Sequence, residues 1–350
     1  MILIKIKKIK IYHLEYLLKK YVYTSFGVMK CRPALIIEIK DNNNNIGLGE
    51  IWCNFPNDGP LYKFNLFKNI FANNLINKNI NNPSDIFKIF DDIKTIFVQS
   101  GDLGSYNSIL SGLNCAIWEL FAKKNNLPLN KLINKNASDN INVYGSGINP
   151  TEAITNIKQA RSIGIKSFKV KIGFKKNLDI NLIKKITKYL KKDEKIMLDV
   201  NQGWSLKQTV EFLNILKKYS IFWIEEPISA LNKDDEYLKI IKTSKIPIAL
   251  GENISSKNKF IKFMRNKNTK FIQPDLTKFG GISLLEKYFK SKFKNKIYLH
   301  FLASGVGLIT SAHVMSSINK KGMLEIDLNN NPLRNFIFNQ PIKITDGQIH

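Results

Sequence analysis

Cysteine is scarce in this sequence, and no long apolar run occurs. The 350 residues include three cysteines, with no CxxC motif and no Cys/His spacing, so neither a disulfide framework nor a cysteine-bound zinc ion is expected. A run of about eighteen apolar residues is absent, and lysines interrupt the apolar residues at the N-terminus, which argues against a membrane span and a secretion signal. We expect a folded protein of the reducing cytoplasm with no membrane partner.

Arginine is scarce as well, although the chain is strongly basic. Lysine and arginine number 54 against 28 acidic residues, so the formal net charge is +26, and such a charge favours nucleic acid or an anionic membrane as the partner. Only four of the 54 are Arg, the residue favoured for reading phosphate and guanine. The lysines are spread along the chain, which is typical of solvated helix surfaces. We therefore predict no nucleic-acid partner, with a basic polyanion-binding barrel as the non-enzymatic alternative.

The length and the first third of the chain indicate more than one structural unit. A chain of 350 residues fits two domains, or one large barrel with an appended module. Alternating apolar residues predict strands near 2–11 and 34–40. Apolar residues at spacings of three and four predict an amphipathic helix over 107–125. This part of the chain therefore reads as α+β.

From residue 141 onward, short apolar runs alternate with lysine-rich helical segments. Polar residues end the runs at intervals such as the 26 residues from Asp199 to Glu225, about the length of a strand plus its return helix. The predicted strands are 141–145, 167–173, 195–201, 221–227, 247–253, 270–275, 296–300 and 323–327. This repetition predicts an α/β fold with a barrel of parallel strands.

The polar residues that end the runs are expected to meet. Right-handed crossovers bring the C-terminal ends of parallel strands to one rim, where barrel active sites lie. A second interpretation is that these residues only begin loops or cap helices. That interpretation suits Asp and Asn, but Lys and Glu are rarely buried unless they are paired. The rim is therefore the predicted functional site.

Two lysines lie on one face of the second predicted barrel strand. Lys169 and Lys171 are two residues apart, so both side chains leave the strand on the same side. Two ammonium groups in one cavity make each other harder to protonate, so one can act as a base while the other stays cationic and holds a substrate carboxylate. A pair of surface lysines is the simpler alternative in so lysine-rich a chain.

Three acids end three successive strands. Asp199, Glu225 and Glu252 are expected side by side at the rim, and three anions together require a cation. Carboxylate oxygens suit Mg²⁺, which we predict as the cofactor. Asn201 shares a face with Asp199 and is predicted to reach the metal or the substrate, whereas Glu226 points the other way and is predicted to support the site.

Asp275 and His300 end the next two predicted strands. A carboxylate in this position orients an imidazole and raises its pKa, which fits a catalytic acid or base. Of the four histidines, only His300 stands at the end of a predicted strand. A lone histidine is more often structural, but the neighbouring acids favour catalysis.

Together with the motifs around them, these residues resemble the enolase superfamily over nearly the whole length of the chain. The matching motifs are GLGE at 47–50, AIWEL at 116–120, KVK at 169–171, LDVNQGW at 198–204, WIEEP at 223–227, LGEN at 250–253 and QPDLTKFGGI at 273–282. Five residues before the Gly-Gly pair, this superfamily has Lys in its muconate-lactonizing branch and Asp in its mandelate racemase branch. Asp275 occupies that position, so the sequence resembles the mandelate racemase branch.

The resemblance implies a division of the chain and further roles. It implies an α+β capping domain over 1–135, a TIM-type (β/α)7β barrel over 136–330, and a C-terminal segment, 331–350, that packs back on the capping domain. Glu325 resembles a residue that hydrogen-bonds the substrate, and Lys278 matches a basic position that is not the catalytic lysine. Relatives are often symmetric assemblies, so a homo-oligomer is expected.

The resemblance also implies the reaction. In such enzymes Mg²⁺ stabilises the enediolate that forms when the proton alpha to a carboxylate is removed. A Lys or His base beside Mg²⁺ is the known form of such a site. Two outcomes stay open: dehydration of a hydroxy acid or acid sugar, which we favour, or racemisation or epimerisation of a hydroxy acid or amino acid derivative. Substrate choice would depend on capping-domain segments near Ser25–Arg32 and Trp52–Pro56, where Arg32 either meets a distal anion or lies on the surface.

Overall fold

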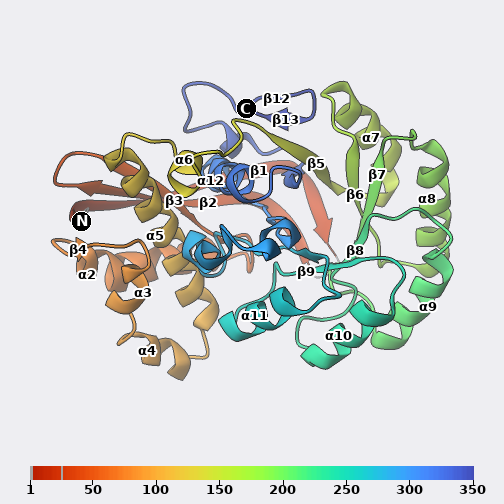
Figure 1. Ribbon diagram of the computed structural model, residues 1–350, viewed down its shortest axis with the longest axis horizontal. Helices are drawn as coiled ribbons and strands as arrows, with labels where there is room; N and C mark the ends of the chain where they lie inside the picture. Colours follow the sequence, from red (N-terminus) through yellow and green to blue (C-terminus); the bar gives the residue numbers. More distant parts are fainter. Residues whose placement is uncertain (1–2, 25–26) are drawn as a thin grey trace.

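The computed structural model describes residues 3–24 and 27–350, and its N-terminal part is a sheet covered by helices (Figure 1). The sheet has the order β3-β2-β1-β4. Its strands are β1 (Ile4–Thr24), β2 (Gly27–Asp41), β3 (Ile46–Ile51) and β4 (Asn79–Ile80). The predicted strands near 2–11 and 34–40 are thus parts of a longer hairpin. In β1, buried Ile4 and Ile6 alternate with exposed Lys5 and Lys7, which places one face on the core.

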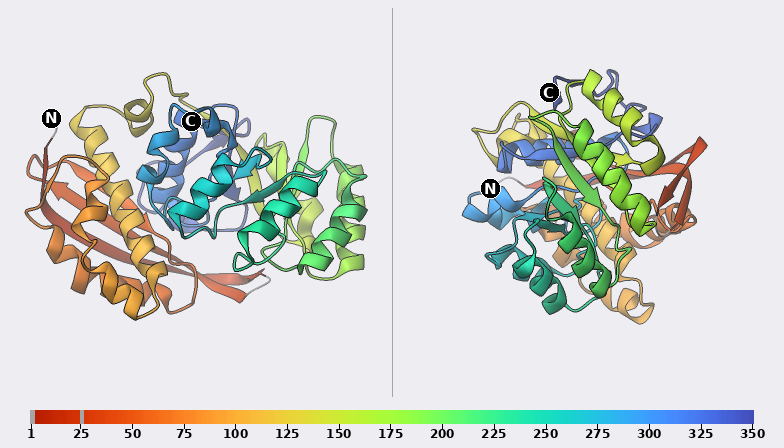
Figure 2. Two further views of the ribbon diagram at one scale, coloured as in Figure 1. Left: turned by 60° about the horizontal axis from the view of Figure 1, so that its bottom comes forward. Right: turned by 90° about the vertical axis from the view of Figure 1, so that its right-hand side faces the viewer.

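The helices of this part cover one face of the sheet, some directly and others by packing on the long helix that lies against it. They are α1 (Gly59–Leu66), the π-helical turn η1 (Phe67–Ala72), α2 (Asn73–Leu75), α3 (Asp85–Ile89), α4 (Lys94–Gln99), α5 (Leu103–Lys124) and α6 (Leu129–Ile133). The helix predicted over 107–125 is α5, and its apolar stripe is buried as expected. Figure 2 shows α5 running along the sheet, while the β1–β2 hairpin extends toward the barrel.

The rest of the chain forms the barrel. Parallel strands pair in the order β11-β5-β6-β7-β8-β9-β10. They are β5 (Ile141–Ile148), β6 (Ser167–Lys171), β7 (Lys195–Asp199), β8 (Trp223–Glu225), β9 (Ile248–Leu250), β10 (Phe271–Ile272) and β11 (Met323–Asp327). The helices are the short η2 (Pro150–Glu152), α7 (Ala153–Ser162), α8 (Lys176–Tyr189), α9 (Leu206–Leu216), α10 (Asp234–Thr243), α11 (Lys257–Arg265) and α12 (Gly305–Ile318). This is the (β/α)7β order that the sequence predicts.

One of the predicted barrel strands is not a strand in the structure. Residues 296–300 do not form a strand but contribute a single parallel bridge, between Ile272 and Ile297. The preceding connection consists of three 3-10 turns, η3 (Ile282–Leu284), η4 (Glu286–Tyr288) and η5 (Lys292–Lys296), where a helix is usual. Gly280 and Gly281 both have positive φ, which allows the chain to bend before these turns.

Aromatic side chains fill the barrel interior below the rim. Trp223, Tyr144 and Tyr298 pack edge to face, and Phe271 lies 4.9 Å from Trp223 between ring centroids. These residues form a buried cluster with Met197, Ala249 and Met323.

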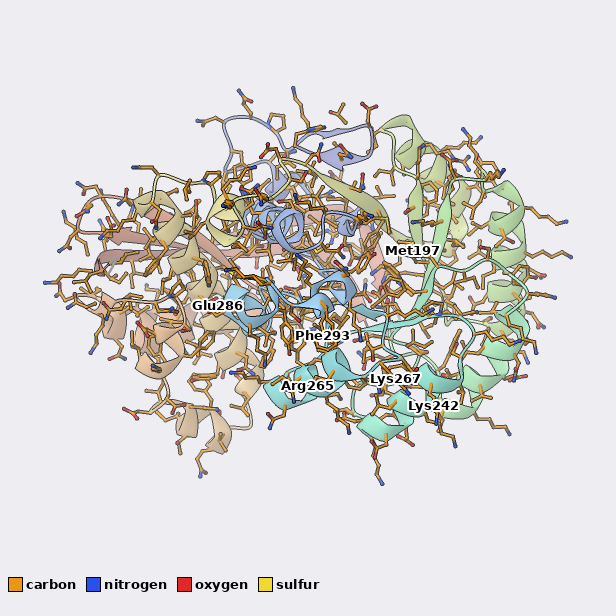
Figure 3. All side chains as sticks on the ribbon, in the orientation of Figure 1. Met197, Lys242, Arg265, Lys267, Glu286 and Phe293 are labelled. Atoms are coloured by element: carbon orange, nitrogen blue, oxygen red, sulfur yellow. The ribbon has the colours of Figure 1, made fainter. Side chains whose placement is uncertain are left out.

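Lysines lie on the outside of the barrel. Figure 3 shows Lys242 and Lys267 on the outer surface, and both are exposed. The solvated-lysine interpretation of the net charge therefore fits these positions.

The C-terminal segment contacts both parts of the molecule. It contains η6 (Pro332–Arg334), β12 (Ile344–Thr345) and β13 (Gln348–Ile349). Leu333 packs with Ala34 and Ile36 of β2, while β13 pairs antiparallel with β5. The domain boundaries at 135 and 330 stay predictions. Among the described helices, none has the length and apolar character needed to cross a bilayer.

Close backbone contact between β3 and α5 yields the first prediction. A Cβ on Gly49 would lie 2.0 Å from the carbonyl oxygen of Gly112, so Gly49→Ala forces the helix away from the sheet. We expect a loss of about 1–3 kcal/mol in the free energy of unfolding, measured by urea titration. Gly104→Ala is the control, because its Cβ would meet nothing nearer than 3.8 Å. Equal stability of Gly49→Ala and wild type would contradict this packing.

A second prediction concerns pH. Arg161 on α7 holds Glu194 through hydrogen bonds of 2.6 and 2.7 Å. Burial raises the pKa of Glu194, but Arg161 outweighs it, so the pKa lies below its usual value. This stabilisation is therefore present above the unfolded pKa of about 4.3 and is lost as pH falls through the folded value. We expect Glu194→Gln to lose on the order of 1 kcal/mol at pH 7, and the gap from wild type to shrink below pH 4. A gap that is constant from pH 7 to 3 would contradict it.

Candidate active site

A cavity of about 60 Å³ lies at the C-terminal rim of the barrel, under the β1–β2 hairpin. The N-terminal part contributes Val22, Met29, Arg32, Trp52 and Phe55, and the barrel contributes Ser146, Lys169, Lys171, Asp199, Asn201, Glu252, His300, Glu325, Asp327 and Asn329, among others. The predicted site residues thus surround one space, with Glu225 and Asp275 buried behind it. Of the two segments expected to select substrate, Ser25 lies outside the described residues, whereas Arg32 and Trp52 line the cavity.

The two lysines of β6 differ in their surroundings. Lys169 is 2% exposed, and its Nζ contacts carboxylate oxygens of Glu225 and, at 2.7 Å, Glu325. Burial lowers the pKa of Lys169, but Glu225 and Glu325 outweigh it, so the pKa lies well above its usual value. Lys171 faces the cavity, donates to Asn201 Oδ1, and lies 3.3 Å from Asp199 Oδ2. Lys169 is therefore a fixed cation, whereas Lys171 reaches the open space.

The acids of β7 and β8 are directly paired in the sheet. Asp199 and Glu225 lie opposite each other in the parallel register, so both carboxylates leave the rim together. Glu225 Oε2 accepts hydrogen bonds from Trp223 Nε1 at 3.1 Å and from Gln273 Nε2 at 2.7 Å. Burial raises the pKa of Glu225 to about 7; Lys169 opposes this, while Asp199 and other acids add to it. Burial is therefore the main reason that the Glu225 carboxyl group holds a proton more tightly than usual.

Glu252 follows β9 and completes the set of acids. Its Oε2 lies 3.1 Å from His300 Nε2, and its charge acts on Glu225. Glu226, the neighbour of Glu225, is buried and accepts a hydrogen bond of 2.6 Å from Asn253. Its role in supporting the site stays a prediction.

The donor set of the rim fits a hard divalent cation. Asp199, Glu225 and Glu252 supply carboxylate oxygens from three neighbouring strand ends, and such oxygens are the ligands that Mg²⁺ prefers. Within residues 3–24 and 27–350, no three acid, histidine or cysteine side chains already converge on one metal-sized point. Lys169, Lys171 and His300 instead contact these acids. Side-chain rotation would be needed to bring the three carboxylates together.

His300 and Asp275 form the predicted pair. His300 Nδ1 lies 2.9 Å from Asp275 Oδ2, and the other oxygen of Asp275 accepts from Thr277 N at 2.8 Å. Burial lowers the pKa of His300, but Glu252, Glu325 and Asp275 outweigh it and raise the pKa to about 10. Burial raises the pKa of Asp275, but the hydrogen bond from His300 outweighs it and lowers that pKa. The imidazole is therefore held as an imidazolium beside the cavity.

Glu325 lies between the two cationic groups. Tyr144 donates to it at 3.0 Å, and Ser146 and Lys169 also contact it. Burial raises the pKa of Glu325, but Lys169 and His300 outweigh it and lower the pKa to about 2. The carboxylate is thus a permanent acceptor at the cavity wall.

A pair that sequence reasoning missed joins the hairpin to the barrel. Arg32 is 2% exposed, so it does not lie on the surface, and its Nη2 lies 2.6 Å from Asp327 Oδ2. Asn329 donates to the other oxygen of Asp327 at 2.7 Å. The signal was available for Asp327, since it lies two residues after Glu325 on the same strand and so shares its face.

The chain is similar to known proteins over most of its length. Residues 152–350 match the family model described as "Enolase C-terminal domain-like". An arabinonate dehydratase of Saccharolobus solfataricus is 27% identical over 75% of this chain and 72% of that protein. An L-Ala-D/L-Glu epimerase of Francisella tularensis subsp. novicida is 26% identical over 77% of this chain and 74% of that protein.

Solved structures agree with the observed architecture. A mandelate racemase/muconate lactonizing enzyme from Bordetella bronchiseptica RB50 has a TM-score of 0.90 and 27% identity, covering 99% of this chain and 94% of its own. A racemase from Streptomyces coelicolor A3(2), solved with bound magnesium, has a TM-score of 0.83 and 20% identity, covering 98% and 94%. At 20% identity, the likeness to the racemase shows the fold alone.

The Arg32–Asp327 pair yields a stability prediction. Removing one partner of a buried ion pair leaves the other charge uncompensated, so we expect Arg32→Met to lose about 3–5 kcal/mol of unfolding free energy. Adding Asp327→Asn should recover part of that loss, which a double-mutant cycle in urea measures. Asp235→Asn, in the exposed pair with Lys262, is the control. Strictly additive losses for Arg32→Met and Asp327→Asn would show that the two residues do not act as a pair.

Proposed function

The chain belongs to the enolase superfamily, and from this membership we propose that it is a Mg²⁺-dependent enzyme of the mandelate racemase branch that removes the proton alpha to a carboxylate. The observation that supports this most directly is the arrangement of Lys171 and His300 on one cavity. Lys171 ends β6 and His300 follows the bridge beyond β10, so the strands that bear the acids separate them. A substrate held between them meets a group on each side. Family membership also favours an enzyme over a polyanion-binding barrel.

Each residue has a proposed role in this reaction. Asp199, Glu225 and Glu252 would hold Mg²⁺, which when bound neutralises the charge that develops on the substrate carboxylate as the alpha proton leaves. Lys171 Nζ takes that proton, and Asn201 and Asp199 orient it. Lys169, already a fixed cation, contributes positive potential below the substrate carboxylate.

The pairing of His300 with Asp275 supports dehydration. The Asp275 carboxylate stabilises a protonated imidazole, which can give its proton to a departing β-hydroxyl. Asp275 fixes the ring through Nδ1, so Nε2 is the atom that donates. Glu325, an ionised acceptor beside this group, is proposed to receive a hydrogen bond from the substrate.

The far end of the cavity supports a hydroxylated substrate. Asp327 balances the charge of Arg32, so this end offers neighbouring donors and acceptors without a free cation. Asn329 and Ser146 add polar groups to the same wall. Hydroxyl groups both donate and accept, and so they match such a wall better than an apolar tail does. An acid sugar is the proposed substrate class.

Epimerisation is the second candidate, because Lys171 and His300 could serve as bases for opposite faces. One relative is a dehydratase and another an epimerase. A cytoplasmic location and a homo-oligomeric state stay predictions.

The test is a screen of acid sugars, hydroxy acids and amino acid derivatives with Mg²⁺ in deuterated water. We expect a keto acid from an acid sugar, with turnover lowered by about a hundredfold or more in Lys171→Ala and in His300→Ala, since each loses a proton-transfer group. Lys176→Ala, an exposed lysine on α8, is the matched control. Chelation should abolish turnover, and Mg²⁺ should restore it.

The outcomes separate the candidates. Deuterium incorporation at the alpha carbon without keto acid favours epimerisation. Full activity of Lys171→Ala refutes its role as base. No exchange and no keto acid from any member of the library would overturn the proposed function.

A further inference from the structure

Thr277 lies behind the pair of His300 and Asp275, in the segment that follows β10. Its hydroxyl group donates a hydrogen bond of 2.6 Å to Asp275 Oδ1, and its backbone N–H donates one of 2.8 Å to the same oxygen. The second oxygen, Oδ2, lies 2.9 Å from His300 Nδ1. One carboxylate thus joins Thr277 to the imidazole, and each of the two partners has its own oxygen.

Of the two bonds from Thr277, the one from the hydroxyl group is the informative one. An Asp side chain commonly accepts from the N–H two residues on, and such a turn forms with many residues at the second position. The hydroxyl group adds a further donor to an ionised acceptor, and its distance of 2.6 Å is typical of charge-assisted bonds. Thr277 is 1% exposed, so this donor serves the carboxylate and not a ligand of the catalytic cavity at the rim.

The orientation of the Asp275 carboxylate decides where the imidazole points. The torsion that turns an Asp carboxyl group is broad, so a single bond does not fix its plane. Two donors, the amide nitrogen and the hydroxyl oxygen of Thr277, restrict this rotation and direct Oδ2 toward His300 Nδ1. The bond at Nδ1 in turn sets the position of Nε2, which lies 3.1 Å from Glu252 Oε2 at the cavity.

Thr277 is itself held from both parts of the molecule. Its carbonyl oxygen accepts from the backbone N–H of Trp52 at 3.1 Å, so the segment after β3 fixes its main chain. A Cβ built on Gly307, in the first turn of α12, would lie 2.9 Å from the γ-methyl group of Thr277, so the helix packs closely on that methyl group. A β-branched side chain has few χ1 conformations, and this packing keeps the hydroxyl group on Asp275.

We propose that Thr277 is a positioning residue for proton transfer at His300. Its hydroxyl group fixes the Asp275 carboxylate, and the carboxylate fixes the imidazole so that Nε2 faces the substrate. Thr277 touches no reacting atom and acts through Asp275. The effect on turnover rests on the proposed function, whereas the effect on the hydrogen bond between His300 and Asp275 exists without any substrate.

The first measurement observes that hydrogen bond directly. Proton NMR of the Mg²⁺-loaded protein detects the Nδ1 proton of His300 as a downfield signal, which is assigned by its loss in His300→Ala. Thr277→Val has nearly the same shape without the hydroxyl group, so we expect it to move the signal upfield or to lose it by faster exchange with water. Thr277→Ser should keep the signal. An unchanged signal in Thr277→Val would overturn the proposal, and so would the absence of the signal in the wild type.

The second measurement separates the two proton transfers in deuterated water. With an acid sugar that the wild type converts, we expect Thr277→Val to form keto acid with kcat lowered by about tenfold and KM unchanged, a smaller loss than removal of the acid itself causes. Lys171 still removes the alpha proton, so recovered substrate should carry more deuterium per turnover than with the wild type. Thr277→Ser should stay close to the wild type. Equal losses in Thr277→Ser and Thr277→Val would show that the hydroxyl group is not responsible.

Thr209 provides the matched control. It is also buried, and its hydroxyl group donates to the carbonyl oxygen of Ser205 at 2.9 Å, outside the catalytic cavity. Thr209→Val should change neither the His300 signal nor kcat, and a change equal to that of Thr277→Val would contradict the proposal. If Thr277→Val does not fold, Thr277→Ala replaces it with the same expectation, because it also lacks the hydroxyl group. A wild type that shows the signal but converts no substrate contradicts the proposed function alone.

Discussion

The ammonium group of Lys169 is the interaction on which the barrel mouth depends. It is buried, and it is the common partner of acids from three strands: Glu225, Glu325 and, at 3.9 Å, Asp199. Without such a cation these carboxylates would repel each other in a space that water cannot screen. The lysine can be buried only because the acids surround it, and the acids can be close only because of the lysine. The remaining negative charge is what makes the rim suitable for a divalent ion.

A second constraint joins the two parts of the molecule. Glu50, at the end of β3, accepts hydrogen bonds from Ser304 and Gly307 at 2.7 and 2.8 Å and so caps α12, the helix that follows His300. Arg32 of β2 reaches Asp327 of β11 in the same way. Both contacts run from the N-terminal sheet to residues next to the site, so the position of the sheet and the geometry of the rim are coupled.

The sequence alone predicted the repeating part of the fold better than its irregular parts. Regular spacing identified the barrel strands, and the motif around Asp275 identified the family, both of which are confirmed. The segment at 296–300 was wrong as a strand, because alternating apolar residues do not show over what length a segment pairs with its neighbour, and here the pairing is a single bridge.

The sequence predicted the candidate site only in part. Residues that end strands could be placed at one rim, and the structure brings them together, although their chemical roles stay predictions. Arg32 could not be placed, since its partner lies 295 residues away and the contact depends on how the hairpin folds over the barrel.

The aromatic cluster below the rim forms the floor of the catalytic cavity. Tyr144, Trp223, Phe271 and Tyr298 fill the barrel below the cavity, so this buried cluster leaves no open path through it to the rim. The indole of Trp223 also holds Glu225. A substitution of Trp223 would therefore change the surroundings of a rim carboxylate, although the indole itself does not line the cavity.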